Sequence, residues 1–464
     1  MLRVARHRLI VCVLIMVILI IIPRGGLFAA TTDPSRKIVT FVDGTSLTDQ
    51  VAIVTTPLPG CAPNTTCKVQ ILHVLSFINT LAVQYPLASL IILDQIVLIL
   101  RSNPKVQDVS DDSLAIKDQE TSLTTELNTP QGAWFEWGQD DGHIRVPPVY
   151  SKGIRGSGVT VAVLDTGIDF THPNLAANIL GGFNAIVEGG SYDDDNGHGT
   201  LTAGIIAAIP YMGKGLIGTA SAADLVAVKV LDTTGRGYLS DVINGLRWVH
   251  DQGIPQYNIR VLNMSLSFAQ GSVPLQKAID RLSKKNAIMV ASAGNCGQAH
   301  GSVDESGGED GGGSATGCDL SQPAQNAVLY PAVYPEVMAV AATDILNNVT
   351  KYSRYGPQVA VTASGGALAS GGTPVCGNTQ QSGRLLSTAP GSGYAWGSGT
   401  SHAAAHASGV VALALQCKPS LSFNQVVAQL QATAHFNTCY PAVRQGAGLI
   451  AAAQLIQALQ PCTQ

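Results

Sequence analysis

The sequence predicts an α/β fold, in which a mostly parallel central sheet carries helices on both faces and a small α+β domain precedes it. Two observations predict this class. From Gly158 onward, short and fully apolar runs alternate with amphipathic runs of helical period, which is the pattern of parallel strands buried on both faces. Between Lys37 and about Gln119, strand-like runs flank one long apolar run. The polar, proline-containing stretch Thr121–Pro148 separates the two parts, and we interpret it as a linker.

Each expected element is a run with one residue pattern. In the smaller part the strand-like runs are Lys37–Val42, Val69–Phe77 and Lys105–Ile116, and the long apolar run is Leu87–Leu100. In the larger part the apolar runs expected to form strands are Val159–Leu164, Asp224–Leu231, Arg260–Ser265, Ala287–Ala291 and Val337–Ala342. The runs expected to form helices are Gly199–Ala208, Tyr238–Asp251, Pro274–Lys285, Ser401–Leu415, Phe423–Ala434 and Leu449–Leu459.

Length and composition indicate a folded protein with a large core. The chain has 464 residues, of which 46% are hydrophobic and 12% are charged, which is enough apolar material for two or three domains. The formal net charge is only −4, and no basic patch with interleaved aromatic residues occurs. Nucleic acid is therefore excluded as an expected partner.

The amino terminus has the layout of a secretory signal peptide. Three arginines precede the apolar run Leu9–Ile22, which is 14 residues long, and small residues follow near Ala29. A membrane-spanning helix usually needs about 18 apolar residues, so we expect residues 1–30 to be a cleaved signal and the protein to be secreted. An uncleaved membrane anchor with the protein facing outside is the alternative, and Arg24 on the far side of the run keeps it open.

The cysteines favour disulfide bonds in an exported protein. Beyond Cys12 in the signal segment there are two cysteines before the linker and six from Cys296 onward, and even numbers favour pairing. We predict only the neighbouring pairs, Cys61 with Cys67 and Cys296 with Cys318. No CxxC or HExxH spacing occurs, so no metal site is predicted. The Gly- and acid-rich insert Gly301–Gly317 is expected to be a solvated loop.

One serine has surroundings that suit a nucleophile. Gly397–Gly409 reads GSGTSHAAAHASG, and Ser401 lies between small residues where a helix is expected to begin. Backbone N–H groups at a helix start are unpaired and partly positive, so they can stabilise the oxyanion that a serine creates when it attacks a carbonyl. The alternative interpretation is an ordinary serine cap at the end of a glycine-rich turn.

Two further motifs supply the groups that such a serine needs. Asp165 follows an apolar strand in VAVLDTGIDFTHPNL, and His198 lies at an expected helix start in DDDNGHGTLTAGIIAA. Strand ends and helix starts of a parallel sheet gather at one edge, and a histidine oriented by a buried carboxylate activates a serine. Taken singly, Asp165 could be a turn former and His198 a helix-start residue. Asp169 and the run Asp193–Asp195 are predicted to be solvated loop acids, because acidic residues in loops usually face solvent. A hydrolase with paired carboxylates is the rival chemistry, but it leaves Ser401 unexplained.

All three motifs, with their flanking residues, resemble those of the subtilisin-like serine proteases, over roughly Thr129 to Leu459. The resemblance implies a serine endopeptidase that hydrolyses peptide bonds in proteins through an acyl-enzyme and without a cofactor. It implies that Asp165 orients His198, that His198 is the general base and then the acid, and that Ser401 is the nucleophile. The segment MVASAGN resembles the one whose asparagine amide donates to the tetrahedral oxygen, which implies that Asn295 belongs to the oxyanion hole.

The resemblance also implies where substrate lies. The family holds a peptide as an added strand between two extended segments, which here resemble Ser265, Leu266 and Ser267 on one side and the stretch from Gly235 on the other. Leu239 lies where the family lines an outer apolar pocket, although its spacing suits the core equally well. Ser267 stands where relatives carry glycine, so we expect a primary specificity pocket that is narrower or differently lined.

Two departures from the family pattern carry expectations. His402 stands where the family usually has methionine beside the nucleophile, so we expect activity that resists peroxide. Asn174 stands where calcium-binding members commonly have aspartate, which weakens the expectation of calcium there. A structural calcium ion remains an open expectation, with the acidic residues of the insert as the alternative ligands. These are Asp304, Glu305, Glu309 and Asp310.

The resemblance finally implies a domain order. Residues 1–30 are the signal, 31–120 an inhibitory pro-domain that helps folding, 121–148 the processing region and linker, and 149–464 the catalytic domain. Self-cleavage is expected between Ile116 and Pro130, and the mature enzyme is expected to be a monomer acting on protein or peptide substrates. The alternatives are a processing protease with one dedicated substrate, which could be membrane-anchored, and a non-catalytic binding protein on the same scaffold.

Overall fold

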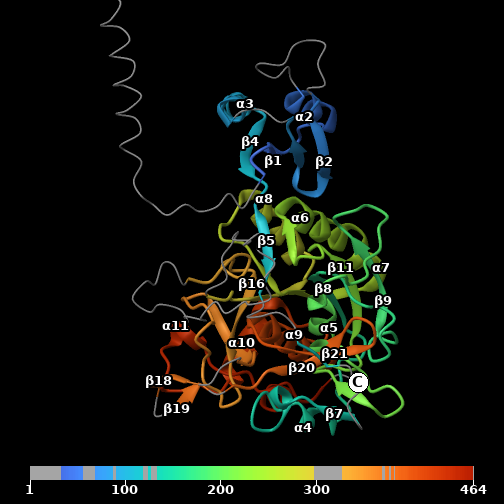
Figure 1. Ribbon diagram of the computed structural model, residues 1–464, viewed down its shortest axis with the longest axis vertical. Helices are drawn as coiled ribbons and strands as arrows, with labels where there is room; N and C mark the ends of the chain where they lie inside the picture. The colour runs from blue at the N-terminus through green and yellow to red at the C-terminus, as the bar shows by residue number, and fades with distance from the viewer. Residues whose placement is uncertain are drawn as a thin grey trace, which may run out of the picture.

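The computed structural model describes residues 33–55, 68–86, 90–118, 124–126, 133–296, 327–367, 371–375, 378–380 and 382–462. It contains a small N-terminal sheet unit stacked on a larger α/β unit, with one strand running from the first into the second (Figure 1). The expected signal segment, the Cys61–Cys67 pair and the insert Gly301–Gly317 lie outside the described residues. Within the described ranges, no helix is long and apolar enough to span a membrane.

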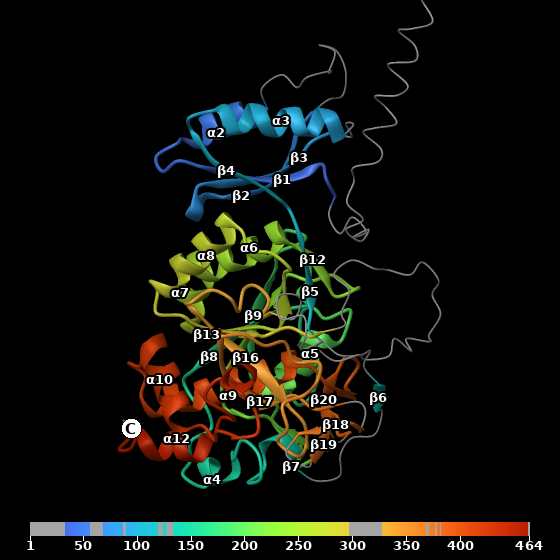
Figure 2. The same ribbon diagram turned by 90° about the vertical axis from the view of Figure 1, so that its left-hand side faces the viewer.

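The small unit is a four-stranded antiparallel sheet in the order β2-β3-β1-β4. Its helices α2 and α3 cover one face, and the other face lies on the larger unit (Figure 2). Side chains alternate between these faces, as a strand requires: Val39 packs under the two helices, whereas Ile38 packs toward the larger unit. The bounds are β1 Arg36–Phe41, α2 Leu47–Val54, β2 Gln70–Leu75, β3 Thr80–Gln84, α3 Leu90–Ser102 and β4 Val106–Asp111.

The larger unit is built on a seven-stranded parallel sheet in the order β17-β16-β15-β13-β8-β11-β9. The predicted fold class is therefore confirmed. Both faces of the sheet are buried: in β8, Val161 packs in the cluster that holds α5 and α9, and Ala162 packs in the cluster that holds α6 and α8. The strands are β8 Thr160–Asp165, β9 Ile179–Asn184, β11 Asp224–Lys229, β13 Ile259–Met264, β15 Ile288–Ser292, β16 Val337–Thr343 and β17 Val359–Ser364.

The helices of the larger unit follow the expected runs with small shifts at their ends. The run expected as one helix at 238–251 is α6 followed by the start of a π-helical turn, Val249–Gly253, and the short α7 follows beyond the run. The last helix begins after Leu449, because Leu449 forms β-bridges with Thr362 and His435. The bounds are α5 His198–Ala207, α6 Leu239–Trp248, α7 Ile254–Tyr257, α8 Val273–Ser283, α9 Thr400–Cys417, α10 Phe423–Thr433 and α12 Ala452–Ala458.

The predicted strand 105–116 is wrong as a single element. The chain leaves the small sheet after β4, and Asp112 marks the break. The carboxylate of Asp112 is fully buried and accepts hydrogen bonds from the backbone N and the Oγ of Ser240 at the start of α6, both at 2.8 Å. Arg36 pairs with the same carboxylate at 2.8 Å. The next strand, β5 (Leu114–Lys117), belongs to a sheet of the larger unit.

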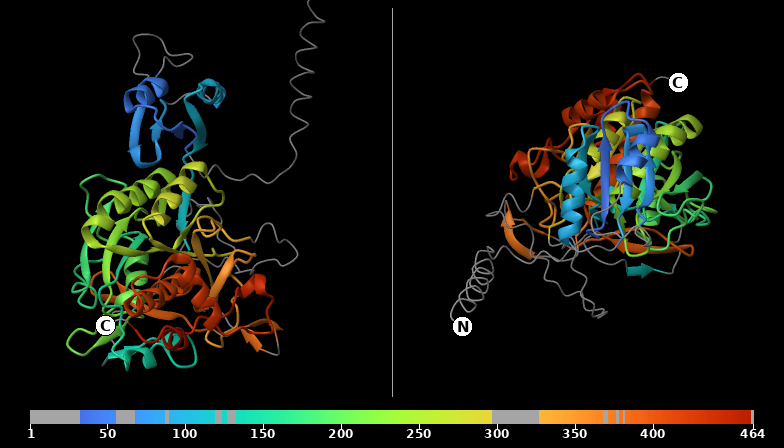
Figure 3. Two further views of the ribbon diagram at one scale, coloured as in Figure 1. Left: turned by 180° about the vertical axis from the view of Figure 1, so that it is seen from behind. Right: turned by 90° about the horizontal axis from the view of Figure 1, so that it is seen from above.

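The two units share one buried interface. The free face of the small sheet lies on α6 and α8, and the view from behind shows the small unit directly above the yellow-green helices (Figure 3). Polar contacts border this apolar layer: His73 Nε2 lies 2.8 Å from Asp241 Oδ1 on α6, and Lys277 Nζ on α8 lies 2.6 Å from Gln107 Oε1. The N-terminal unit is therefore packed onto the larger one through apolar and polar contacts.

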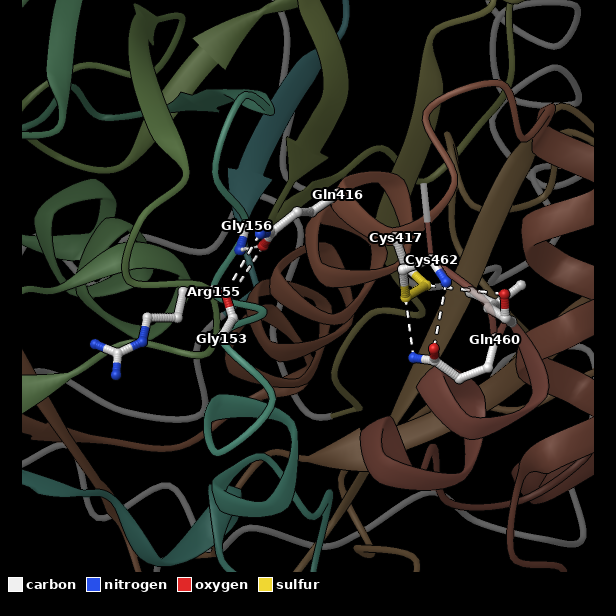
Figure 4. The surroundings of a disulfide bond; sticks show 8 residues. Gly153, Arg155, Gly156, Gln416, Cys417, Gln460 and Cys462 are labelled. Carbon is white, nitrogen blue, oxygen red and sulfur yellow. Dashed lines mark hydrogen bonds between the residues drawn. A yellow bond between two sulfur atoms is a disulfide. The ribbon is translucent and has the colours of Figure 1, made fainter. Parts of the chain in front are cut away.

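One disulfide bond within the described residues joins Cys417, at the end of α9, to Cys462 near the carboxyl end (Figure 4). It is neither of the two predicted pairs. Beside it, the Gln416 side chain accepts hydrogen bonds from the backbone N–H groups of Arg155 and Gly156 at 2.7 and 2.6 Å. Cys296 is also disulfide-bonded, but its predicted partner Cys318 lies outside the described residues.

Candidate active site

Three elements end or begin at one edge of the central sheet, and each carries one predicted residue. Asp165 is the last residue of β8, His198 is the first residue of α5, and Ser401 lies in the first turn of α9. All three side chains are buried, with exposed fractions of 1% or less. A parallel sheet brings its strand ends to a common edge, so residues far apart in the sequence gather here.

Asp165 and His198 form a direct pair. His198 Nδ1 lies 2.7 Å from Asp165 Oδ1, and the backbone N–H of Thr166 donates to the same oxygen at 2.7 Å. The helix start reaches the strand end because Gly199 has no side chain: a Cβ there would lie 2.0 Å from the carbonyl oxygen of Gly167. With Nδ1 engaged by the carboxylate, the buried Nε2 of His198 has no hydrogen-bond partner. It is the ring nitrogen that can accept a proton.

Ser401 lies beside a second imidazole. Its Oγ is 3.3 Å from His402 Nδ1, and its backbone carbonyl accepts a hydrogen bond from Ser265 Oγ at 3.0 Å. Burial, followed by the nearby His198 and His406, holds the pKa of His402 well below its usual value. A neutral His402 leaves His198 as the ring that has a carboxylate to stabilise its protonated form. The structure brings His198 and Ser401 to the same edge but does not join Ser401 Oγ to His198 Nε2.

Asn295 follows β15 and is held by the residue before the serine. Its Oδ1 accepts hydrogen bonds from Thr400 Oγ1 at 2.7 Å and from the backbone N–H of Thr400 at 3.1 Å. The buried Nδ2 has no partner, so the amide is oriented with its donor side free. The pattern around Asn295 identified this residue, but nothing local to Thr400 indicated that it fixes the amide.

The chain's own strand β5 lies across the site. It pairs antiparallel with β12 (Arg236–Tyr238) on one side and with β14 (Leu266–Ser267) on the other. These are the two segments expected to hold a substrate. Two more backbone hydrogen bonds extend this pairing: Lys117 N donates to the carbonyl of Gly235 at 3.1 Å, and Asp118 N donates to the carbonyl of Ser265 at 3.1 Å. The descent of β5 from the small unit into the large one is visible in Figure 2.

Asp118 lies beside Ser401. Its carbonyl oxygen accepts a hydrogen bond from the backbone N–H of Ser401 at 3.2 Å. Its side chain is fully buried, and Ser267 Oγ donates to one carboxylate oxygen at 2.7 Å while Ser292 Oγ donates to the other at 2.6 Å. Neither Ser292 nor Asp118 was among the predicted site residues. Ser292 lies within the MVASAGN segment, but that pattern pointed only to Asn295, and no local pattern marks Asp118.

Leu239 is a core residue, which is one of the two positions that its spacing allowed. Its side chain is 2% exposed and belongs to the same apolar cluster as Val242 and Ala115 of β5. Its backbone N–H donates to the carbonyl of Ser113 at 2.7 Å. Leu239 therefore packs in the apolar layer against β5.

The prediction that the nearby acids are solvated is wrong for two of them. Asp169 is 5% exposed, and Asp194 is 7% exposed. Asp194 accepts hydrogen bonds from Thr166 Oγ1 at 2.8 Å and from Thr200 Oγ1 at 2.6 Å, so it ties the end of β8 to the first turn of α5. Sequence reasoning missed this residue because an acidic run in a loop usually faces solvent.

Asn174, which stands where calcium-binding members of the family commonly have aspartate, is engaged within the protein. Its Nδ2 donates to the carbonyl of Ile209 at 2.7 Å, and its Oδ1 accepts from the hydroxyl of Tyr394. Across the described ranges, no group of three or more His, Cys, Asp or Glu side chains is arranged to hold a metal ion. The acidic residues of the insert lie outside those ranges.

The contact between His402 and Ser401 leads to a prediction about oxidation. Wild-type enzyme treated with millimolar peroxide should keep most of its activity, because the side chain beside Ser401 is an imidazole and not a thioether. The variant His402→Met should lose activity under the same treatment. Residual activity and circular dichroism are measured together on both proteins. Wild-type inactivation with the fold intact would contradict the prediction.

Comparisons with known proteins agree on one family. Residues 156–449 match the model of the subtilase family. Subtilisin BL from Lederbergia lenta is 36% identical over 291 residues, which are 63% of this chain and 88% of that relative. The thermostable alkaline protease of Halalkalibacterium halodurans is 33% identical over 337 residues, covering 73% of this chain and 74% of the relative. Subtilisin NAT of Bacillus subtilis subsp. natto is 34% identical over 310 residues, covering 66% and 68%.

Proposed function

The chain belongs to the subtilase family and is a serine-type endopeptidase, and on this premise we propose that Ser401 is its nucleophile, His198 its general base and Asp165 the carboxylate that orients the base. Asn295 and the backbone N–H of Ser401 are the proposed oxyanion donors. The observation that carries this assignment is the buried 2.7 Å contact between His198 and Asp165, with His198 Nε2 left to accept a proton. This is the catalytic scheme for which subtilisin is itself a standard example.

In the proposed reaction, Ser401 Oγ forms a bond to the substrate carbonyl carbon as His198 Nε2 takes its proton. The negative charge that develops on the carbonyl oxygen is met by Asn295 Nδ2 and by Ser401 N–H. His198 then gives the proton to the leaving amine, which departs and leaves an acyl group on Ser401. Water, activated by His198, hydrolyses the acyl-enzyme.

Hydrolysis needs no cofactor in this scheme. Any structural calcium ion is proposed to lie away from Asn174.

We further propose that the protein is made as a zymogen. In this view the segment ending at Asp118 is the pro-domain, and β5 occupies the cleft as a product does after cleavage. The support is the hydrogen bond from the backbone N–H of Ser401 to the Asp118 carbonyl, which favours cleavage directly after Asp118. That bond falls inside the interval Ile116–Pro130 expected from the sequence. The interface with α6 and α8 supports an inhibitory role, because it holds the segment on the enzyme.

The proposed location is outside the cell, with residues 1–30 as the export signal and a membrane-anchored processing protease as the alternative. A monomeric mature enzyme is proposed to act on proteins and peptides.

A non-catalytic binding protein on this scaffold is the competing function. Labelling with a fluorophosphonate probe separates the two, because only an activated serine reacts. Folded protein freed of its N-terminal segment should be labelled, and amino-terminal sequencing of the mature form should begin at Gln119. Absence of label on that protein would favour the binder.

The buried carboxyl of Asp118 predicts that inhibition depends on pH. Burial raises its pKa from its ordinary 3.8 to about 6, although Ser292, Ser267, Arg354 and His198 all oppose the rise. A pKa that is higher in the bound state means that binding is strongest below about pH 4 and is lost as pH rises through 6. The cleaved but still associated complex should therefore dissociate more readily at pH 8 than at pH 5, by about tenfold.

The measurement is the dissociation constant of that complex across this pH range, read from recovered activity on dilution. The matched variant is Asp118→Asn, which keeps the shape of the side chain but cannot titrate. Because the enzyme's own pH dependence is common to both proteins, only the ratio of the two constants is interpreted. Identical profiles for wild type and variant would contradict the prediction.

A further inference from the structure

The pocket that receives Asp118 is lined by hydroxyl groups. Ser267 comes from β14 and Ser292 from the last position of β15, and both side chains are fully buried. Each hydroxyl donates to a different oxygen of the Asp118 carboxylate, at 2.7 and 2.6 Å. Two donors converging on two oxygens match the shape and charge of a short carboxylate.

The charge around this pocket also suits an acid. Arg354 is anchored behind it by hydrogen bonds from Nε to the carbonyl of Asn295 at 3.3 Å and from Nη1 to the carbonyl of Ala327 at 3.2 Å. Burial lowers the pKa of Arg354, and the nearby Asp118 partly offsets this effect by raising it. The guanidinium in turn lowers the pKa of the Asp118 carboxyl, and so offsets part of the rise that burial causes.

The backbone of the same segment is held as a substrate strand would be. β5 is paired on both sides, Asp118 N–H donates to Ser265, and the Asp118 carbonyl faces Ser401 N–H. The Asp118 side chain is thus in the pocket that selects the residue on the amino-terminal side of the bond to be cut. The backbone hydrogen bonds and the side-chain contacts of Asp118 are therefore both those expected of a bound substrate residue.

We propose that this protease selects peptides with aspartate at the position whose carbonyl is attacked, and that Ser267 and Ser292 are the residues that determine this specificity. The inference rests on the proposed function, because it takes Asp118 as a bound substrate residue. An apolar side chain in this pocket would leave buried hydroxyls without their acceptors, which costs binding. Ser292 would keep only a longer contact, 3.5 Å to the carbonyl of Met264.

The test uses mature enzyme and fluorogenic peptides that copy Leu114–Asp118, with aspartate, leucine or phenylalanine as the last residue before the reporter. The expected kcat/KM for the aspartate peptide is at least about tenfold above that for either apolar peptide, because an unsatisfied buried hydroxyl has a penalty of that order. A smaller ratio overturns the inference.

Variants assign the selectivity to the pocket. Ser267→Ala and Ser292→Ala should each lower the ratio of aspartate to leucine kcat/KM, by about tenfold. The matched control is Ser151→Ala, which removes an exposed hydroxyl that donates to the carbonyl of Pro148 and should leave the ratio unchanged. A ratio that stays the same in both pocket variants overturns the inference.

Fluorophosphonate labelling of every preparation keeps this test separate from that of the proposed function. Labelled enzyme that prefers leucine or phenylalanine is a working serine protease with another specificity, so only the inference fails. Folded mature protein that is neither labelled nor active on any peptide refutes the proposed function itself.

Discussion

Replacing Ser401 by alanine will leave the full chain folded and uncut after Asp118. The hydroxyl is the group that attacks in the proposed reaction, and in subtilisin the loss of the nucleophilic serine lowers kcat by about 10⁶-fold. Self-cleavage should slow by the same order and become undetectable. The fold should persist, because the Oγ removed makes only a 3.3 Å contact with His402.

The measurement is incubation of the purified full chain, followed by gel analysis, intact mass and circular dichroism. Wild type should convert to a form beginning at Gln119, whereas Ser401→Ala should accumulate intact and take up no fluorophosphonate. Ser283→Ala is a suitable control, because Ser283 is a half-buried serine on α8 that donates to the carbonyl of Asp280. Conversion of Ser401→Ala at the wild-type rate would show that another group performs the cleavage.

Replacing Asn295 by alanine should lower kcat by about 10²–10³-fold and change KM little. The amide Nδ2 is a buried donor without a partner in the described structure. It is therefore available for the oxygen that becomes negative only as the carbonyl is attacked. Removing one such donor typically costs this much, and the loss falls on the transition state more than on substrate binding.

A second substitution tests whether the orientation of this amide matters. Thr400→Val removes the hydroxyl that donates to Asn295 Oδ1 at 2.7 Å but keeps the backbone donor at 3.1 Å. Its kcat should fall by roughly tenfold, less than for Asn295→Ala, because one of two anchors remains. Both variants are compared at saturating substrate after active-site titration. A fall confined to KM in Asn295→Ala would mean that the residue binds substrate and does not stabilise the oxyanion.

Much of the fold could be predicted from periodicity, and the exceptions have identifiable causes. Strands such as β8 are continuous apolar runs, so burial on both faces was readable. The edge strand β9 reads ILGGFN, and its two glycines interrupt the apolar pattern. The single run 105–116 looked like one strand, because nothing local shows that Asp112 is buried at the start of α6. The two strands on either side of it belong to different sheets.

The residues proposed for catalysis were found because each lies in a local motif. Asp165, His198 and Ser401 are flanked by glycines and apolar runs that place them at strand ends and helix starts. The contact between the first two could not be measured from sequence. It depends on the close approach of Gly199 to Gly167, and on the buried Asp194 that ties the same two segments together.

By itself, then, the sequence determined the α/β class, the segments that carry the chemistry and the residue types available at them, because all three follow from patterns a few residues long. Only the tertiary structure decided what lies against Ser267 and Ser292 in the proposed specificity pocket. Asp118 meets Ser267 and Ser292 across 149 and 174 residues of sequence. No local pattern relates such positions. They come together because β5 pairs between β12 and β14, and that pairing is a property of the folded chain.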